Sequence, residues 1–160
     1  MTANGHNING RNVVKLEFTS AFEMLDFVQV VSDHLSRSIG LDEDSLHWVS
    51  VAIRESVINA IKHGNRSDTS KHVFVEFETA KPADVPEIRI RVRDQGDGFD
   101  PEHVANPLDP ENLLKASGRG IFLIRSFMDD MQLARAPEGG MEIRMVKRVQ
   151  PPSVGDAARA

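Results

Sequence analysis

RESVINAIKHGN, residues 54–65, is the stretch of sequence from which the rest of the chain can be interpreted. It has the pattern of a helix end, in which Glu55 and Asn59 are four residues apart and therefore lie on one face. His63 continues that row one turn further on. An Asn side chain offers a neutral oxygen to Mg²⁺, and a Glu side chain can accept a proton from a hydroxyl group or water. The row therefore suits a metal ion and a polyphosphate, although such spacing alone is more often the solvated side of an amphipathic helix.

The composition is that of one ordinary soluble domain. The chain has 160 residues, of which 40% are hydrophobic and 27% charged, so it can bury a core and is not disordered. It contains no cysteine, which excludes disulfides, zinc–thiolate sites and thiol catalysis. No apolar run approaches the roughly 18 residues of a membrane span, and the first residues contain no apolar signal core. We therefore expect a cytoplasmic protein without a membrane partner. A net charge of −5 without a basic block argues against nucleic acid as the main partner.

Upstream of the opening stretch, the sequence predicts a flexible N-terminal tail over residues 1–12 and a short strand over 13–18. A first helix follows, in which apolar residues recur at spacings of three and four. Ser20 and Glu23 have the spacing of a capping box that would open this helix, and Gly40 would end it.

A second helix is predicted from Asp42, whose side chain can cap the helix start, to about His63. Gly64 would stop this helix. Further on, residues 72–79 and 87–94 alternate between apolar and polar side chains, so each is predicted to be a strand with one buried face. Because the two strands are close in sequence, we expect them to form an antiparallel pair.

Residues 100–117 show no periodicity, and a loop of this length inside a compact domain is usually functional. Gly118 would open an apolar helix, and residues 131–136 and 141–149 are predicted to form a hairpin. Residues 150–160 should be a flexible C-terminal tail.

Together these elements predict one domain over residues 13–149, without internal repeats or a second domain. Its fold class is α/β (α+β): a two-layer sandwich with a mixed, mainly antiparallel sheet of about five strands and about three helices on one face.

Asp94, Gly96 and Gly98 form a D-x-G-x-G motif directly after the second strand of the antiparallel pair. A dinucleotide fingerprint is excluded because the third glycine is missing and no βαβ unit surrounds the motif. A carboxylate at a strand end can instead accept a hydrogen bond from an exocyclic amine such as that of adenine. The glycines would let the backbone lie flat beside the base.

Gly118, Arg119 and Gly120 form a second glycine motif at a helix start. Free backbone N–H groups and the positive end of the helix dipole make such a start an anion site. Arg119 and Lys115 would add positive charge where a polyphosphate lies. Either glycine motif alone more often only makes a turn. The order of an E-x-x-x-N helix, a D-x-G-x-G strand end, a long loop and a G-x-G helix start is much harder to obtain by chance.

In that order, these motifs resemble the GHKL ATPase superfamily, whose ATP site is the Bergerat, or histidine-kinase-like, fold. Within the superfamily, ESVINAIKHG (residues 55–64) and SGRGIFLI (residues 117–124) are most similar to the bacterial anti-sigma factor serine/threonine kinases. The resemblance covers roughly residues 13–148. The three motifs together are specific for the superfamily and moderately specific for the subfamily.

The resemblance implies ATP and Mg²⁺ as ligands and gives each motif residue a role. Asn59 would ligate the Mg²⁺ that bridges the phosphates, and Glu55 would be the general base. Asp94 would bind the adenine amine, with Gly96 and Gly98 beside the base.

At the phosphate end, the resemblance implies a lid at about residues 100–117 that closes over the bound phosphates. The residues that would hold the phosphates are Lys115, Gly118, Arg119 and Gly120. His63 matches a family position near the phosphates, although a packing role fits it as well. Met141 stands where the family usually has a threonine that helps to bind adenine, so one adenine contact is expected to be weaker.

By the same resemblance, the chain is a kinase that transfers the γ-phosphoryl group of ATP to a serine or threonine of a STAS-type anti-sigma factor antagonist. It would otherwise bind a sigma factor and regulate transcription, and it would be a homodimer. One alternative is an ATP-binding interaction module of the same fold without productive transfer. A stand-alone histidine-kinase-type catalytic module is less favoured, because no acidic residue directly follows His34 and no long pair of dimerisation helices is present. A plain α/β scaffold would need three coincident motifs.

Overall fold

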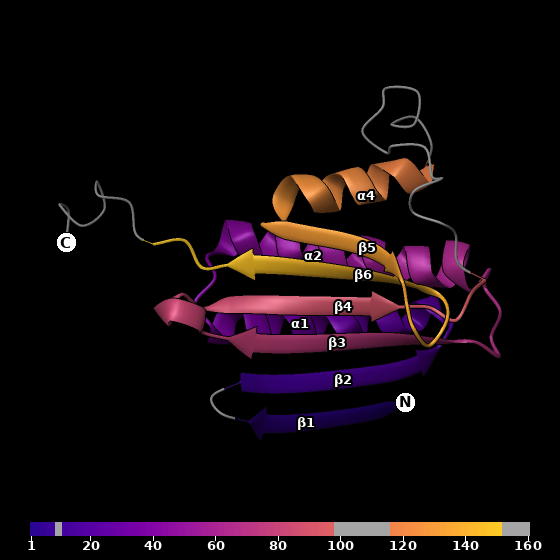
Figure 1. Ribbon diagram of the computed structural model, residues 1–160, viewed down its shortest axis with the longest axis horizontal. Helices are drawn as coiled ribbons and strands as arrows, with labels where there is room; N and C mark the ends of the chain where they lie inside the picture. The colour runs from indigo at the N-terminus through magenta and orange to yellow at the C-terminus, as the bar shows by residue number, and fades with distance from the viewer. Residues whose placement is uncertain (9–10, 98–115, 152–160) are drawn as a thin grey trace.

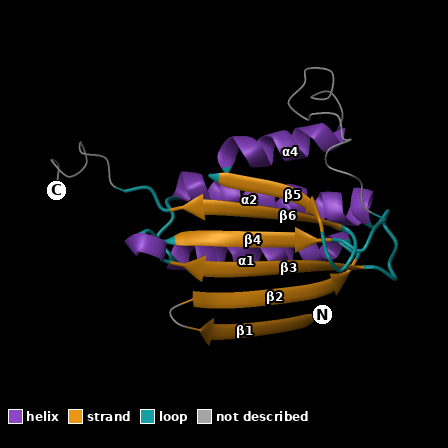
Figure 2. Ribbon diagram, viewed as in Figure 1, coloured by secondary structure: helices purple, strands orange, loops and turns teal. Residues whose placement is uncertain are grey.

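A six-stranded antiparallel sheet forms one layer of the structure, a computed structural model that describes residues 1–8, 11–97 and 116–151. The strand order is β1-β2-β3-β4-β6-β5, and every neighbouring pair is antiparallel (Figures 1 and 2). The strands are β1 (Thr2–Ile8), β2 (Arg11–Thr19), β3 (His72–Ala80), β4 (Glu87–Arg93), β5 (Asp130–Arg135) and β6 (Met141–Arg148). The α/β sandwich predicted from the sequence is confirmed, with six strands where about five were expected and with no parallel pair among those described.

Helices form the second layer. They are α1 (Leu25–Ser38), which follows the 3-10 turn η1 (Phe22–Met24), α2 (Glu43–Asn59), which continues into the π-helical turn η2 (Ala60–Gly64), and α4 (Ala116–Phe127). A further 3-10 turn, η3 (Pro82–Asp84), joins β3 to β4. In Figure 1, α1 and α2 lie behind the sheet and α4 runs along its β5 side. Within the described ranges, we find no helix with the length and apolar character needed to span a bilayer.

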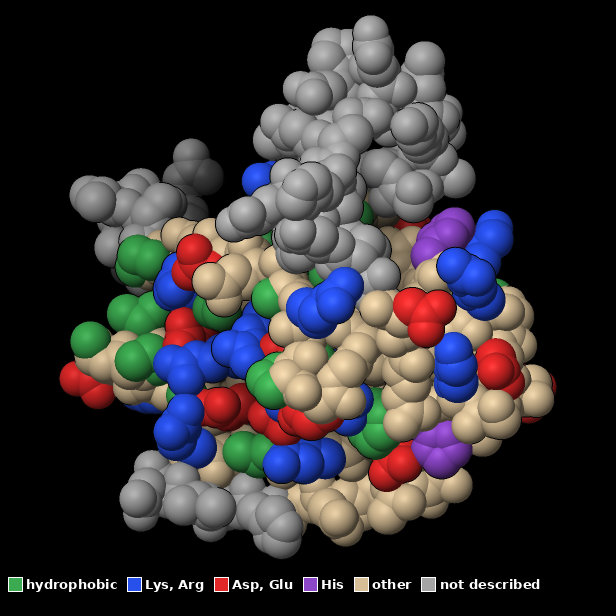
Figure 3. All heavy atoms as spheres, turned by 45° about the vertical axis from the view of Figure 1, so that its right-hand side comes forward, with side chains coloured by type: hydrophobic (Ala, Val, Ile, Leu, Met, Phe, Trp, Pro, Cys, Tyr) green, Lys and Arg blue, Asp and Glu red, His purple; other side chains and the backbone are tan. Residues whose placement is uncertain are grey.

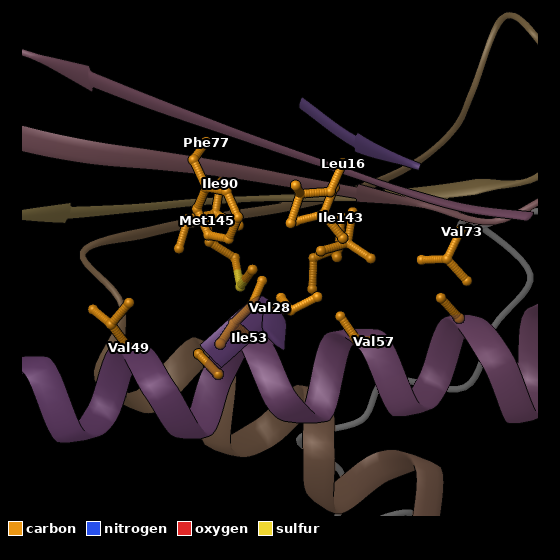
Figure 4. Close-up of a cluster of buried hydrophobic side chains, with 14 of the residues drawn as sticks. Leu16, Val28, Val49, Ile53, Val57, Val73, Phe77, Ile90, Ile143 and Met145 are labelled. Carbon is orange, nitrogen blue, oxygen red and sulfur yellow. The ribbon is translucent and has the colours of Figure 1, made fainter. Parts of the chain in front are cut away.

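The core lies between α2 and the sheet. Val49, Ile53 and Val57 recur every fourth residue of α2, so they share one face, and none of the three is exposed. They point toward sheet residues that include Phe77 and Met145, which are also fully buried (Figure 4). Each such side chain contributes about 1.5–3 kcal/mol by leaving water. This packing fixes which face of α2 is turned away from the sheet.

The expected N-terminal tail is instead largely a strand. Thr2–Ile8 pairs with β2 over its whole length, from Thr2 opposite Glu17 to Ile8 opposite Arg11. The strand could not be recognised from apolar periodicity because residues 2–7 contain only one apolar side chain, Ala3. Backbone hydrogen bonds to a neighbouring strand hold it, and such bonds require no apolar pattern.

The predicted capping box of Ser20 and Glu23 is wrong. The hydroxyl group of Ser20 donates to the carbonyl oxygen of Lys71 at 3.0 Å, and the 3-10 turn η1 leads into α1 without a side-chain cap. The signals at Gly40 and Asp42 are confirmed. Gly40 has φ +89° just beyond α1, and Oδ1 of Asp42 accepts the backbone N–H of Ser45 at 2.7 Å.

The other face of the sheet is covered by charged side chains. Figure 3 shows Lys and Arg side chains interleaved with Asp and Glu side chains over this face. Glu87 and Glu142 are each only 3% exposed because arginines from the neighbouring positions lie against them. Nη2 of Arg89 is 2.6 Å from Glu87, and Nη2 of Arg91 is 2.5 Å from Glu142. Arg89 and Arg91 of β4 are therefore paired with carboxylates, while the guanidinium group of Arg93 lies over the ring of Phe74.

Trp48 of α2 stacks on Phe127 of α4, with ring centroids 3.4 Å apart and ring planes inclined by 3°. It is the chain's one tryptophan, so its fluorescence reports on the contact between the two helices. Phe127→Ala should lower the free energy of unfolding by about 2 kcal/mol, because a half-buried ring and its stacking partner lose their contact. The emission of Trp48 should move to longer wavelength as water reaches the ring.

Phe122→Ala is the matched control, since Phe122 lies on the same helix and its side chain is exposed. Denaturant unfolding followed by tryptophan fluorescence measures both variants. Equal effects of the two substitutions would contradict the described packing of α4 on α2.

Candidate functional site

Asp94 is the centre of the candidate site, at the end of β4. Its side chain is 5% exposed, and its Oδ1 accepts backbone N–H groups from Gly96 at 2.9 Å and Met141 at 3.1 Å. The backbone N–H of Asp94 in turn donates to the carbonyl oxygen of Met141 at 3.0 Å. Hydrogen bonds among the described residues engage Oδ1 of this carboxylate and leave Oδ2 available as an acceptor.

Three glycines from separate segments enclose the Asp94 carboxylate and the backbone beside it. A Cβ atom on Gly64 would lie 2.0 Å from Oδ2 of Asp94, and one on Gly140 would lie 2.1 Å from the Asp94 carbonyl oxygen. A Cβ atom on Gly96 would lie 2.0 Å from the carbonyl oxygen of Gly64. No side chain can occupy these positions unless the Asp94 side chain, in the case of Gly64, or the backbone, in the case of Gly96 and Gly140, moves. Gly140 also has φ +82°, a conformation that favours glycine.

Burial is the main influence on the acidity of Asp94. It raises the pKa of this carboxyl group, because the charged form loses solvation. The N–H groups of Met141 and Gly96 and the charges of Arg93 and Lys71 act in the opposite direction. A buried carboxylate with a free acceptor oxygen is suited to a ligand that brings an N–H donor.

A second group of residues lies on the face of α2 that points away from the sheet. Glu55 and Asn59 are both half-buried there, and Gly120 of α4 sits against them. A Cβ atom on Gly120 would be 2.9 Å from Oε2 of Glu55 and 3.2 Å from Nδ2 of Asn59. The structure thus brings together a carboxylate, a carboxamide and the second turn of α4. The shared face of Glu55 and Asn59 is what their four-residue spacing predicted.

His63 does not continue the row as regularly as the sequence suggested. It lies in the π-helical turn Ala60–Gly64, where the four-residue alignment of an α-helix no longer holds, and its side chain is exposed. Gly118 and Arg119 lie within α4, which begins at Ala116, two residues before the expected start. Gly98, Lys115 and nearly all of the expected lid over residues 100–117 fall outside the described residues.

The two ends of the site are compatible with ATP in size and chemistry. Gly64, beside Asp94, and Glu55 are nine residues apart along α2 and η2, or about 13 Å at the rise of an α-helix. Among the described residues, no group of three or more His, Cys, Asp or Glu side chains could hold a metal ion.

Sequence reasoning missed Gly64 and Gly140 as site residues, and also the backbone N–H of Met141. The signal was present, because a glycine pair in a hairpin and a glycine at a helix end both mark unusual backbone positions. What the sequence could not show was that both glycines meet Asp94. The contact from residue 141 is made by the backbone, so it does not depend on the side chain that replaces the usual threonine.

The chain is similar in sequence to known proteins. The sequence profile of the histidine kinase-like ATPase domain matches residues 21–147. An anti-sigma F factor of Oceanobacillus iheyensis is 30% identical over 143 residues, covering 87% of this chain and 94% of that protein. A serine-protein kinase RsbW of Staphylococcus aureus is 26% identical over 144 residues, covering 86% of this chain and 87% of that protein.

Asp94→Asn should be at least as stable as the wild type at pH 7, because an amide carries no charge to bury while its oxygen can still accept the two N–H groups. The pKa of Asp94 is raised in the folded state, so the stability linked to this group is present at low pH and is lost as pH rises through the folded pKa. In denaturant unfolding, the free energy of unfolding of the wild type should therefore rise relative to that of the variant as pH falls from 7 toward about 4.

Asp68→Asn is a control with the opposite sign. Hydrogen bonds from the side chain and backbone of Ser70 lower the pKa of Asp68, so this variant should lose stability at pH 7, and the loss should disappear as pH falls. The same pH dependence for both variants would contradict the burial described for Asp94.

Proposed function

Because the chain belongs to the histidine kinase-like ATPase family, we propose that it is an ATP-dependent protein serine/threonine kinase that acts as an anti-sigma factor. Its protein substrate would be a STAS-type anti-sigma factor antagonist, phosphorylated on serine or threonine. In the absence of that substrate it would sequester a sigma factor, and it would work as a homodimer in the cytoplasm. One observation carries the proposal. The buried carboxylate of Asp94, with only Oδ1 bonded among the described residues, lies at one end of the site, and Glu55 and Asn59 lie beside α4 at the other.

The base would be recognised by Asp94. Its Oδ2, which no hydrogen bond among the described residues engages, can accept a hydrogen bond from the exocyclic amine of adenine. Guanine presents a carbonyl oxygen at the corresponding position. Gly64, Gly96 and Gly140 keep side chains away from the carboxylate, so a flat base can approach it. Adenine would be preferred over guanine, because the guanine carbonyl oxygen and Oδ2 of Asp94 are both acceptors and could not form a hydrogen bond with each other at this buried site.

Asn59 and Gly120 would lie at the phosphate end. When bound, Mg²⁺ would neutralise the charge that develops on the phosphates during transfer. Asn59 would hold this ion through its side-chain oxygen. Gly120 leaves room beside Glu55 and Asn59 that a larger residue would fill. Gly118, Arg119 and Lys115 would add amide and cationic groups there.

Glu55 would act as the general base. The hydroxyl oxygen of the acceptor serine or threonine forms a bond to the γ-phosphorus, while the bond between that phosphorus and the β–γ bridging oxygen breaks. Glu55 takes the hydroxyl proton, and ADP leaves. The half-buried position of Glu55 beside Asn59 supports this role, because it keeps the carboxylate next to the metal ligand.

A second candidate is an ATP-binding interaction module that sequesters its partner without useful transfer. The relative named as an anti-sigma F factor favours it, since that name gives an action against a sigma factor and no kinase activity, whereas the relative named as a serine-protein kinase favours transfer.

Incubation with γ-labelled ATP, Mg²⁺ and a purified STAS-type antagonist tests the proposal. The wild type should label the antagonist on serine or threonine. Glu55→Gln should bind ATP but transfer at least 100-fold more slowly, because the proton acceptor is lost. Glu43→Gln is the matched control, since Glu43 lies at the exposed start of the same helix.

Labelling at the wild-type rate by Glu55→Gln would exclude Glu55 as the base. ATP binding by the wild type without transfer to any antagonist tested would favour the interaction module.

A further inference from the structure

We propose that Asn65 is a positioning residue that fixes the base end of the nucleotide site relative to its phosphate end. The proposal rests on the proposed function for its nucleotide readout, but the structural part can be tested without a ligand. Asn65 directly follows the π-helical turn, and its side chain is completely buried. A buried carboxamide is costly unless its polar atoms are bonded, so its partners show what it holds together.

Both ends of the Asn65 side chain are occupied. Oδ1 accepts the backbone N–H of Gln95 at 2.7 Å, and Nδ2 donates to Oγ of Ser20 at 2.9 Å and to the carbonyl oxygen of His72 at 2.9 Å. Gln95 directly follows Asp94, Ser20 directly follows β2, and His72 begins β3. One side chain therefore ties the end of the α2–η2 helix to three segments at the same end of the sheet.

The backbone of Asn65 adds a fourth connection. Its N–H donates to the carbonyl oxygen of Ala60 at 2.8 Å, a contact between residues five apart that closes the π-helical turn. Such turns are rare, they place one more residue in a helical turn, and they often occur at functional sites. Here the turn lies between Asn59, at the phosphate end, and Gly64, which packs against the Asp94 carboxylate.

Gln95 is held a second time by its own side chain. Its Oε1 accepts the backbone N–H of His72 at 2.7 Å, so the residue after Asp94 is bound through both backbone and side chain. Because peptide geometry links Gln95 to Asp94 and Asn65 to Gly64, the bond between Asn65 and Gln95 sets how these neighbours meet. Asn65 thus acts through Asp94 and Gly64 and would not itself touch the nucleotide.

Substitutions can test the hydrogen bonds of Oδ1 and those of Nδ2 of Asn65 separately. Asn65→Ala removes every side-chain contact. Asn65→Asp keeps an oxygen for the Gln95 N–H but loses the donors to Ser20 and His72. Ser20→Ala removes one of the Nδ2 contacts and leaves Oδ1 intact, so it is the matched control for lost stability without loss of the Gln95 bond.

Two readouts test the proposal at a temperature at which all variants are folded. The first is amide hydrogen exchange of Gly96 and Met141, whose N–H groups bond to Asp94 and not to Asn65. Exchange of both amides should be at least tenfold faster in Asn65→Ala and little changed in Ser20→Ala. The second is the ratio of dissociation constants for ATP and GTP with Mg²⁺, measured by calorimetry.

Asn65→Ala should bind ATP at least tenfold more weakly than the wild type does, and it should lose most of the preference for ATP over GTP. Asn65→Asp and Ser20→Ala should keep that preference even where their unfolding midpoints are lower. If Asn65→Ala does not fold, Asn65→Asp and Ser20→Ala test the proposal, because both keep an oxygen that accepts the Gln95 N–H. Loss of the ATP preference in either variant would show that the bond to Gln95 is not the positioning contact.

Unchanged protection of Gly96 and Met141 in Asn65→Ala, or wild-type ATP selectivity in a destabilised Asn65→Ala, would show that Asn65 has only a general structural role. Absence of ATP binding by the wild type would overturn the proposed function instead. Amide exchange would then decide the positioning role by itself.

Discussion

The burial of one carboxylate, that of Asp94, is the constraint on which the described site depends. An acidic group at the end of a central strand loses most of its hydration, and its pKa is raised as a result. Two backbone N–H groups from different segments donate to Oδ1 and replace part of the lost hydration. Glycines at three positions allow the surrounding backbone to approach Asp94 closely. The hairpin between β5 and β6, the turn after β4 and the end of the α2–η2 helix must therefore meet at this group.

The second organising feature is the two-sided nature of α2. One face packs into the sheet through Val49, Ile53 and Val57, which are fully buried. Since that face is fixed, the row of Glu55 and Asn59 must point away from the sheet, where Gly120 of α4 meets it. Core packing and site geometry are thus consequences of the same helical periodicity.

Much of the fold could be predicted from the sequence, because strong apolar periodicity marks α1, α2 and strands β3, β4 and β6. The edge strand β1 could not, because polar residues paired only through their backbone leave no periodic pattern. In the site, Glu55, Asn59, Asp94 and the glycine motifs could be proposed as functional residues from their spacing and order. Asn65 could not, because its side-chain partners are 7, 30 and 45 residues away and only the folded chain brings them together.

The measurement that tests the central claim most directly is a crystal structure of the chain with Mg²⁺ and a non-hydrolysable ATP analogue. We expect the exocyclic amine of adenine within hydrogen-bond distance of Oδ2 of Asp94, and the metal ion bound to the side-chain oxygen of Asn59. Glu55 should face the γ-phosphate end. A base bound elsewhere, or a metal ion held without Asn59, would contradict the account of how this site recognises its ligand.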